Sequence, residues 1–274
     1  MLSFRRRSQK TTRASWLGLV ALFATTAVAA QPDTRTLRPM STDRPDATES
    51  PFTVDAGHVQ LELDFANFSR DREGGVETKE WEVAPFNLRF GVAHDFELGV
   101  FLTPFHQVEE KAAGGPRERS EGVADPVLRA KWNFFGNDGG DLALGLVADV
   151  KLPIGARAVS NREWEGALLL PLSFSLGAGW EGAAMTGVEI VYSDAGRHRA
   201  VWINTITAGR DLTDRLGVFL ELTSATGDGP HVATVDAGLT FRANENLQFD
   251  VGVYRGLSHA ATDITAFAGV ARRW

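Results

Sequence analysis

Cysteine is absent from the 274 residues, so the chain has no disulfide scaffold, no thiolate zinc site, no thiol nucleophile and no lipid anchor at a cysteine. No stretch after the N-terminus approaches the ~18 apolar residues that a membrane helix needs, which excludes a helical transporter or receptor. Positive charge is scarce beyond residue 30. The 28 Lys and Arg fall to 23 without the five in residues 1–30, against 35 Asp and Glu, a net charge of −12. This acidity argues against nucleic acid as a partner, because phosphate backbones would be repelled.

The first 30 residues have the pattern of a secretory signal peptide. Five bases up to Arg13 are followed by a short apolar region from Ala14 to Ala24 and by small residues around Ala27 to Ala30. This order of basic, apolar and small residues predicts cleavage near residue 30, with an uncleaved anchor helix as the alternative. We therefore expect an exported protein with a mature chain that begins near residue 31.

From Gly57 onward the apolar residues recur every second position, which is the period of a strand and not of a helix. In one segment Val59, Leu61 and Leu63 alternate with polar residues such as Gln60 and Glu62. The pattern predicts roughly twelve strands, an even number, over these ranges: 59–66, 86–92, 96–103, 128–134, 142–152, 168–176, 188–192, 202–208, 216–223, 235–241, 247–254 and 264–274. The face of the strand around Trp202 is not settled by the pattern, because Trp202 and Asn204 share a side.

Short and long connections are expected to alternate along the chain. Short turns are predicted at 93–95, 136–140, 177–181, 211–214 and 243–246, and longer polar loops at 69–78, 109–122, 155–163, 193–198, 225–231 and 256–262. An up-and-down barrel of the outer membrane has this arrangement, with tight periplasmic turns and larger external loops. The predicted fold is therefore an all-β transmembrane antiparallel barrel over residues 57–274.

A soluble sandwich or lipocalin-like barrel would also show one apolar face. Three features favour the membrane barrel. The polar face is charged on most strands, as a lumen would be: Glu62, Asp64, Arg89, Glu97, Arg129, Lys131, Asp149, Lys151, Glu189, Glu221, Asp236 and Asp250. Aromatic residues gather beside the short turns, where an interfacial girdle lies: Phe90, Phe96, Phe134, Phe241 and Phe249. The last residue, Trp274, is of the aromatic type read as a signal during barrel assembly.

The segment Thr42-Asp43-Arg44-Pro45-Asp46, followed by Glu49-Ser50-Pro51 and by Gly57-X-X-Gln60-X-Glu62, resembles the opening of the outer-membrane family called "putative MetA-pathway of phenol degradation". Asn87-Leu88-Arg89-Phe90-Gly91, residues 125–131 and Leu152-Pro153 are similar to later parts of that family. The resemblance covers most of the mature chain. It implies a barrel and a context of transport or aromatic catabolism.

Residues 31–56, before the first strand, are dense in charge and proline and predict neither strand nor helix. A disordered periplasmic tail is one interpretation. The other is a plug folded into the lumen, because lumen charges left without partners in a confined space are costly. Asp43, Asp46 and Glu49 would then meet bases such as Arg89, Arg129, Lys131 and Lys151, while Arg44 would meet Glu62 or Asp64. The candidate lumen and gating residues are Thr42, Asp43, Arg44, Asp46, Glu49, Glu62, Asp64, Arg89, Glu97, Arg129, Lys131, Asp149 and Lys151.

Enzymatic activity is not expected. The sequence lacks Gly-X-Ser-X-Gly, and no closely spaced pair of His and Asp suggests a metal site; the six histidines are His58, His94, His106, His198, His231 and His259. We expect no catalytic residue, cofactor or metal. The predicted function is a porin-like channel for passive passage of small solutes, aromatic or hydrophobic ones among them, with a structural or adhesive barrel as the alternative. The expected partners are outer-membrane lipids, the barrel-assembly machinery and a small-molecule solute; the oligomeric state stays open.

Overall fold

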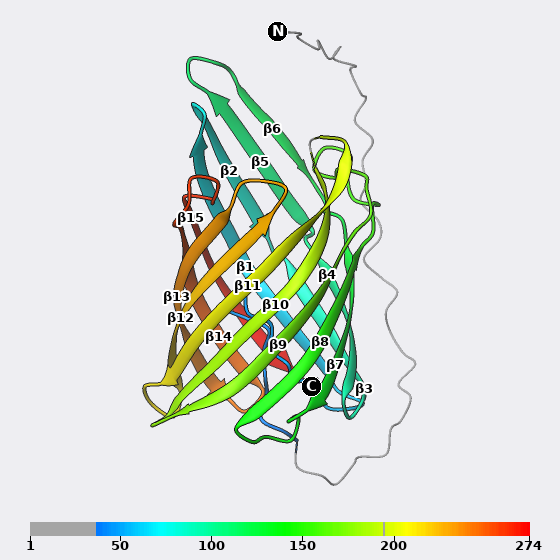
Figure 1. Ribbon diagram of the computed structural model, residues 1–274, viewed down its shortest axis with the longest axis vertical. Coiled ribbons are helices and arrows are strands. Elements are labelled where there is room, and N and C mark those ends of the chain that lie inside the picture. The colour runs from blue at the N-terminus through cyan, green and yellow to red at the C-terminus, as the bar shows by residue number, and fades with distance from the viewer. Residues whose placement is uncertain (1–36, 194) are drawn as a thin grey trace. The chain divides into compact units, whose positions relative to one another are not determined.

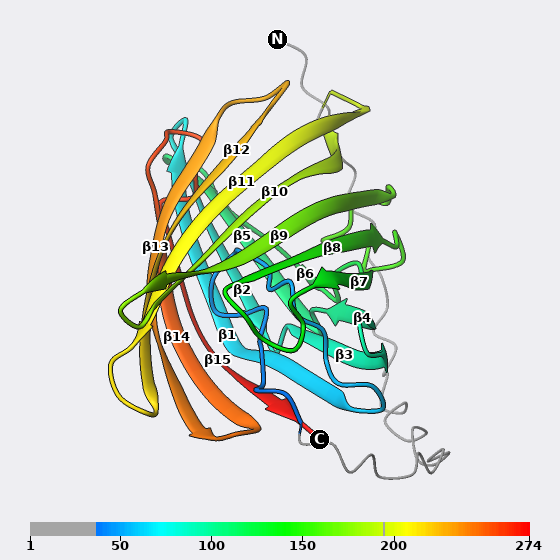
Figure 2. The same ribbon diagram turned by 60° about the horizontal axis from the view of Figure 1, so that its bottom comes forward.

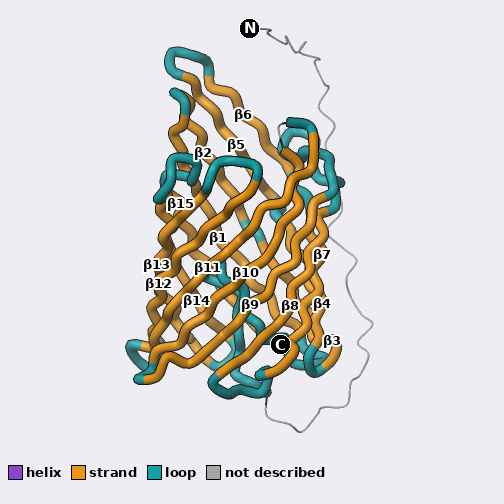
Figure 3. The backbone as a smooth tube through the Cα atoms, in the orientation of Figure 1, coloured by secondary structure: helices purple, strands orange, loops and turns teal. Residues whose placement is uncertain are grey.

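The computed structural model describes residues 37–193 and 195–274, so the predicted signal peptide and cleavage site lie outside the described residues. Every regular element in the described part is a strand (Figure 3). The fifteen strands are β1 Val59–Glu73, β2 Val76–Val83, β3 Phe86–Ala93, β4 Phe96–Leu102, β5 Phe105–Ala112, β6 Arg117–Gly122, β7 Val127–Phe135, β8 Leu142–Lys151, β9 Glu165–Gly177, β10 Trp180–Ser193, β11 Arg197–Asp211, β12 Leu216–Gly227, β13 Val232–Asn244, β14 Leu247–Gly256 and β15 Ile264–Arg273. None of these residues belongs to a helix long and apolar enough to cross a membrane.

The strands form one antiparallel sheet that closes on itself, because β1 pairs with β15 from Gln60–Arg273 to Arg70–Ile264 (Figure 1). Three of the barrel's twelve strands are each built from two pieces, namely β2 with β3, β4 with β5, and β6 with β7. Each break contains a proline, at Pro85, Pro104 and Pro126, which has no N–H to give to the ladder. The predicted twelve-stranded barrel is confirmed, and prolines explain the three additional segments.

The two faces of the wall differ as the alternation predicts. On β7, the side chains of Leu128 and Trp132 face outward and are 46% and 50% exposed. Arg129 and Lys131 lie between them in the sequence, point into the lumen and are 6% and 0% exposed. Exposure of these apolar side chains to water would cost free energy, whereas their contact with lipid is favourable. Apolar residues outside and polar residues inside are typical of the wall of an outer-membrane barrel. The structure also settles the strand around Trp202: Trp202 and Asn204 face outward, where Thr186 Oγ1 donates to Asn204 Oδ1 at 2.9 Å.

The two ends of the barrel differ in their connections (Figure 1). One end, here the turn end, carries the connections 94–95, 136–141, 178–179, 212–215 and 245–246. The opposite end, here the hairpin end, carries 74–75, 113–116, 152–164, 194–196, 228–231 and 257–263. The predicted turns are all at the turn end, as expected.

The prediction of six long loops is wrong for four of them. Residues 69–78 and 109–122 are mostly strand, with only Gly74-Gly75 and residues 113–116 as connections, and residues 193–198 and 225–231 shrink to three- and four-residue connections. The strands of these hairpins continue beyond the apolar band, where both faces meet water. The apolar alternation therefore disappears there although the backbone pairing continues.

Candidate functional site

The chain before β1 lies inside the barrel. Residues 37–56, here the inner segment, begin and end at the turn end, where Arg38 Nε donates to Asp55 Oδ1 at 2.8 Å. Between these residues the segment rises into the lumen and reaches β12, where the Thr48 N–H donates to Glu221 Oε1 at 2.8 Å. Figure 2 shows this path, in blue, within the ring of strands. The inner segment is therefore a loop inserted from one end of the lumen and returned to the same end.

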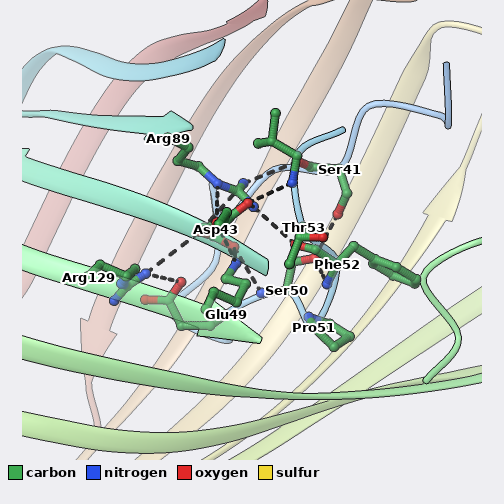
Figure 4. A network of polar contacts seen from close by, with 12 residues as sticks. Ser41, Asp43, Glu49, Ser50, Pro51, Phe52, Thr53, Arg89 and Arg129 are labelled. Atoms are coloured by element: carbon green, nitrogen blue, oxygen red, sulfur yellow. Dashed lines mark hydrogen bonds and ion pairs between the residues drawn. The ribbon is translucent and has the colours of Figure 1, made fainter. Parts of the chain in front are cut away.

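Asp43 is the centre of a buried group of charges that joins the inner segment to β3 and β7 (Figure 4). Its carboxylate accepts a hydrogen bond from Lys131 and lies 3.5 Å from Arg89 Nη1 and 3.6 Å from Arg129 Nη1. Arg129 also pairs with Glu49 of the same segment at 2.6 Å. Because Arg89 and Lys131 are fully buried, withdrawal of Asp43 would leave them in a confined space without their shared partner, which is costly.

Wall carboxylates complete the pairing of these bases. Arg89 Nε donates to Glu97 Oε1 at 2.8 Å and Arg89 Nη1 to Glu62 Oε1 at 2.6 Å. Arg129 Nη2 donates to Asp149 Oδ2 at 2.7 Å. Each base therefore has partners on the barrel wall as well as on the inner segment, so the wall holds these side chains in place for the segment to bind.

Arg44 forms a second anchor on the opposite side of the segment. Its guanidinium donates to Asp64 of β1 at 2.5 Å and to both carboxylate oxygens of Asp250 of β14 at 2.6 and 2.9 Å. The Asp250 side chain is fully buried and that of Arg44 is 13% exposed. Fork-like contacts of this type are among the strongest in proteins. Arg44 thus connects the segment to β1 and β14, the two strands that lie on either side of β15 in the sheet.

The tip of the inner segment meets an acidic part of the wall. The N–H groups of Ala47 and Thr48 donate to Glu221 at 2.7 and 2.8 Å, and the Thr48 hydroxyl contacts both Glu221 and Thr205. Asp46 stands beside Glu221, and no base lies within ion-pair distance of it among the described residues. Backbone N–H groups therefore hold the tip in place of cations.

Small wall residues make room for the segment. A Cβ on Gly91 would overlap the backbone carbonyl oxygens of Val54 and Asp55, and a Cβ on Gly145 would lie 3.0 Å from the Pro51 carbonyl oxygen. Asn133 Nδ2 donates to that same Pro51 oxygen at 2.9 Å. The segment is thus fitted against the wall at backbone level, as well as through charged side chains.

Most of the candidate lumen residues come together around the inner segment, and this set is Thr42, Asp43, Arg44, Asp46, Glu49, Glu62, Asp64, Arg89, Glu97, Arg129, Lys131 and Asp149. Two expectations are wrong. Lys151 lies toward the hairpin end and pairs with Glu165 at 2.7 Å, because its position near the end of β8 puts it beyond the segment's reach. Asp46 meets Glu221 instead of a base, because the tip is held through its N–H groups.

Several contacts of the segment were not expected from the sequence. Asp250 and Tyr254 both lie on the polar face of the strand predicted over residues 247–254. The sequence predicts neither the pairing of Asp250 with Arg44 nor the hydrogen bond that the Tyr254 hydroxyl donates to the Pro45 carbonyl at 2.8 Å. Both occupy inward positions of β14, so the alternation of apolar and polar residues predicts that their side chains point into the lumen. Nothing in the spacing of Arg38 and Asp55 indicated that the two ends of the segment would meet.

A cavity of about 270 Å³ lies beside the segment, toward the hairpin end. Its lining combines the apolar side chains of Leu169, Met185 and Ile203 with polar and charged ones, among them Glu49, Arg129, Asp149 and Glu189. Within the described residues, no cluster of three or more His, Asp or Glu side chains is arranged to hold a metal ion.

The histidines of the described residues are spread over both ends of the barrel. His94 lies near Asp138 at the turn end, and His106 lies 3.4 Å from Glu80 on the hairpin side. His231 Nε2 is 3.0 Å from Ser224 Oγ, and among the described side chains no carboxylate is hydrogen bonded to its other ring nitrogen. This pair therefore lacks the orienting group of a hydrolytic triad.

Comparison with known proteins agrees with this architecture. Residues 42–274 match the family described as "Putative MetA-pathway of phenol degradation". An outer membrane channel from Pseudomonas putida F1 has the same fold, with a TM-score of 0.63 at 12% identity over 85% of this chain and 100% of that chain. The β domain of the Bordetella autotransporter BrkA has a TM-score of 0.52 at 12% identity over 80% and 100% of the two chains.

No curated protein matches the sequence. The family match begins at Thr42, within the inner segment, and extends through the whole barrel to Trp274. The resemblance stated from the sequence motifs is thereby confirmed. The chain belongs to the family described as "Putative MetA-pathway of phenol degradation" and is a twelve-stranded β-barrel of the outer membrane.

Proposed function

We propose that the protein is a channel for passive diffusion of small solutes and that the inner segment is its gate. The observation that carries this proposal is the inner segment itself, a loop that enters and leaves the lumen at one end and crosses it on charged contacts. A purely structural barrel has no need of a separable loop in its lumen. Residues 37–56 contain no strand of the sheet, so the loop can leave without breaking a ladder.

The solutes that fit best are small and amphipathic. The 270 Å³ cavity beside the segment is lined by the apolar side chains of Leu169, Met185 and Ile203 and by polar groups that include the Glu49–Arg129 pair. A phenol-sized molecule could place its ring against the apolar side chains and its hydroxyl against the polar groups. The description of the family, which names phenol degradation, supports the same class of solute.

The test is removal of the charged part of the gate, residues 42–51. The ends of the deletion lie near each other, because the Ser41 and Phe52 carbonyl oxygens both accept hydrogen bonds from the Arg89 guanidinium, at 3.3 and 3.1 Å. We expect higher conductance in planar bilayers and faster swelling of liposomes in phenol and in small sugars. A variant in which residues 42–51 are replaced by Gly and Ser at equal length controls for chain length.

Equal conductance of the intact chain and of the deletion variant, with both barrels folded by heat-modifiable migration on gels, would refute the gate. If neither the intact chain nor the deletion variant passes solute, the structural or adhesive barrel would be favoured instead.

A further inference from the structure

The strands that extend past the membrane at the hairpin end separate their charges by face. On β2, β5 and β6 the side chains of Lys79, Lys111, Arg117 and Arg119 share the outward face with Trp81, because they alternate with it in register. The carboxylates on that face are paired: Glu77 with Arg70 and Arg72, Glu109 with Arg117, and Glu121 with Arg119.

The inward face of the same strands is acidic. Asp71, Glu80, Glu82, Glu110 and Glu118, here the vestibule acids, lie on the face directed at the barrel axis. Glu80 lies 3.4 Å from His106, and Asp71 accepts a hydrogen bond from the Asp263 N–H at 3.3 Å, but no Lys or Arg of the described residues lies within ion-pair distance of any of the five. The sheet therefore places matched charges outside and uncompensated carboxylates along the entrance.

A cavity of about 130 Å³ lies deeper in the lumen, beside the inner segment. Its lining includes Glu62, Asp64, Asn87 and Phe101 of the wall and Arg44 of the segment, and Glu62 and Asp64 are paired with Arg89 and Arg44. Asn87 is 3% exposed, and neither its amide oxygen nor its amide nitrogen has a hydrogen-bond partner in the part of the chain that the structure describes. A buried carboxamide with unused oxygen and nitrogen atoms, beside carboxylates, fits a transient polar occupant.

Farther down, beside the tip of the inner segment, Asp46, Glu221 and Asp236 face the lumen. Glu221 and Asp236 are directly opposite each other on β12 and β13, and no base of the described residues pairs with them. Within the described residues, the lumen thus has carboxyl groups without a base at its entrance and beside the tip of the inner segment, while the bases Arg44, Arg89, Arg129, Lys131 and Lys151 are each paired with carboxylates.

We propose that the channel selects by charge, admitting cations and neutral solutes and excluding anions, and that the vestibule acids are the main determinants of this selectivity. The inference rests on the proposed function, because it specifies which solutes the same lumen passes. A narrow passage lined by one sign of charge raises the local concentration of counter-ions and repels ions of the same sign. Aromatic amines and phenols would pass, whereas aromatic carboxylates would be held back.

The test is the reversal potential of the full chain in planar bilayers under a KCl gradient. We expect a K⁺/Cl⁻ permeability ratio several-fold above one at low salt that falls as salt is raised, because screening shortens the reach of these charges. If the intact chain passes no current, the variant without residues 42–51 is measured in the same way. Absence of current in both overturns the proposed function and this inference together.

Two triple variants of equal charge change locate the determinant. Glu80→Gln, Glu82→Gln and Glu110→Gln neutralise three inward carboxylates, while Glu77→Gln, Glu109→Gln and Glu121→Gln neutralise three outward ones on the same hairpins. We expect the inward variant to move the permeability ratio toward one and the outward variant to leave it unchanged, with both barrels folded. A conducting channel with a ratio of one or below, or equal effects of the two variants, overturns the selectivity while the proposed function stands.

Discussion

Arg44→Ala is expected to loosen the docking of the inner segment in the lumen. Arg44 is the base that pairs with both Asp64 and Asp250, and the Asp250 side chain is fully buried. Without the guanidinium, the two carboxylates would remain in the lumen wall uncompensated for as long as the segment stays docked. Removal of one partner from a buried pair costs about 3–5 kcal/mol.

The Arg44 side chain is 13% exposed, so the lower end of that range is appropriate. A loss of about 3 kcal/mol in docking corresponds to roughly a 100-fold rise in the undocked-to-docked ratio, since 1.4 kcal/mol is a factor of ten. The carboxylates regain water once the segment leaves, so the penalty falls on the docked state alone. The open probability should rise by about the same factor until it saturates.

The assay is open probability in planar bilayers together with protease cleavage of the inner segment in the purified barrel. Arg70→Ala is the matched control, because Arg70 loses its pair with Glu77 on the outer surface, a change worth about 1 kcal/mol or less. Adding Asp64→Asn and Asp250→Asn to Arg44→Ala should recover part of the docking, because it removes the residual buried charge. Unchanged open probability and unchanged cleavage of Arg44→Ala in a folded barrel would refute the reasoning.

Three further outcomes are expected. Gly91→Ala should raise conductance with the barrel still folded, since its Cβ overlaps the backbone of residues 54–55 and not a wall strand; unchanged conductance in bilayers would contradict the close fit. Trp274→Ala should lower the amount of barrel in the outer membrane, measured by heat-modifiable migration, because the Trp274 side chain is 54% exposed at the end of the last strand; normal insertion would remove this role. External protease on intact cells should cut at residues 113–116 of the hairpin end and not at 136–141 of the turn end, and the reverse pattern would invert the topology.

The sequence predicted the wall of the barrel well because lipid imposes a one-sided pattern. Leu128 and Trp132 alternate with Arg129 and Lys131, and only one register places the first pair in lipid and the second in the lumen. Beyond the apolar band this constraint ends, because both faces meet water. The sequence therefore predicts loops where β5 and β6 form. The pairing of these two strands depends on backbone hydrogen bonds, which impose no pattern on the polarity of the side chains.

Charge complementarity predicted that the inner segment would suit the lumen, but it did not fix the partners. Asp43 and Glu49 meet expected bases, whereas Arg44 takes Asp250 in addition to Asp64, from a strand about two hundred residues later. Asp46 has no base within ion-pair distance among the described residues, because the tip of the segment is placed by the N–H groups of Ala47 and Thr48, which bind Glu221. Partners of this kind follow from the path of the backbone through the lumen, and periodicity carries no information on that path.

The motifs behind the family resemblance are two halves of one internal interface. Asp43 and Arg44, from the first motif, contact Glu62, Arg89 and Asp64, and Gln60 donates to the Ser41 carbonyl at 2.8 Å. The Ser50 hydroxyl of the second motif contacts the Ser41 hydroxyl at 2.7 Å, which holds the outgoing and returning arms of the segment together. A strand needs only alternation, which many sequences provide, whereas the residue types of these motifs hold a loop against the lumen wall. The resemblance therefore rests in part on residues that dock the inner segment.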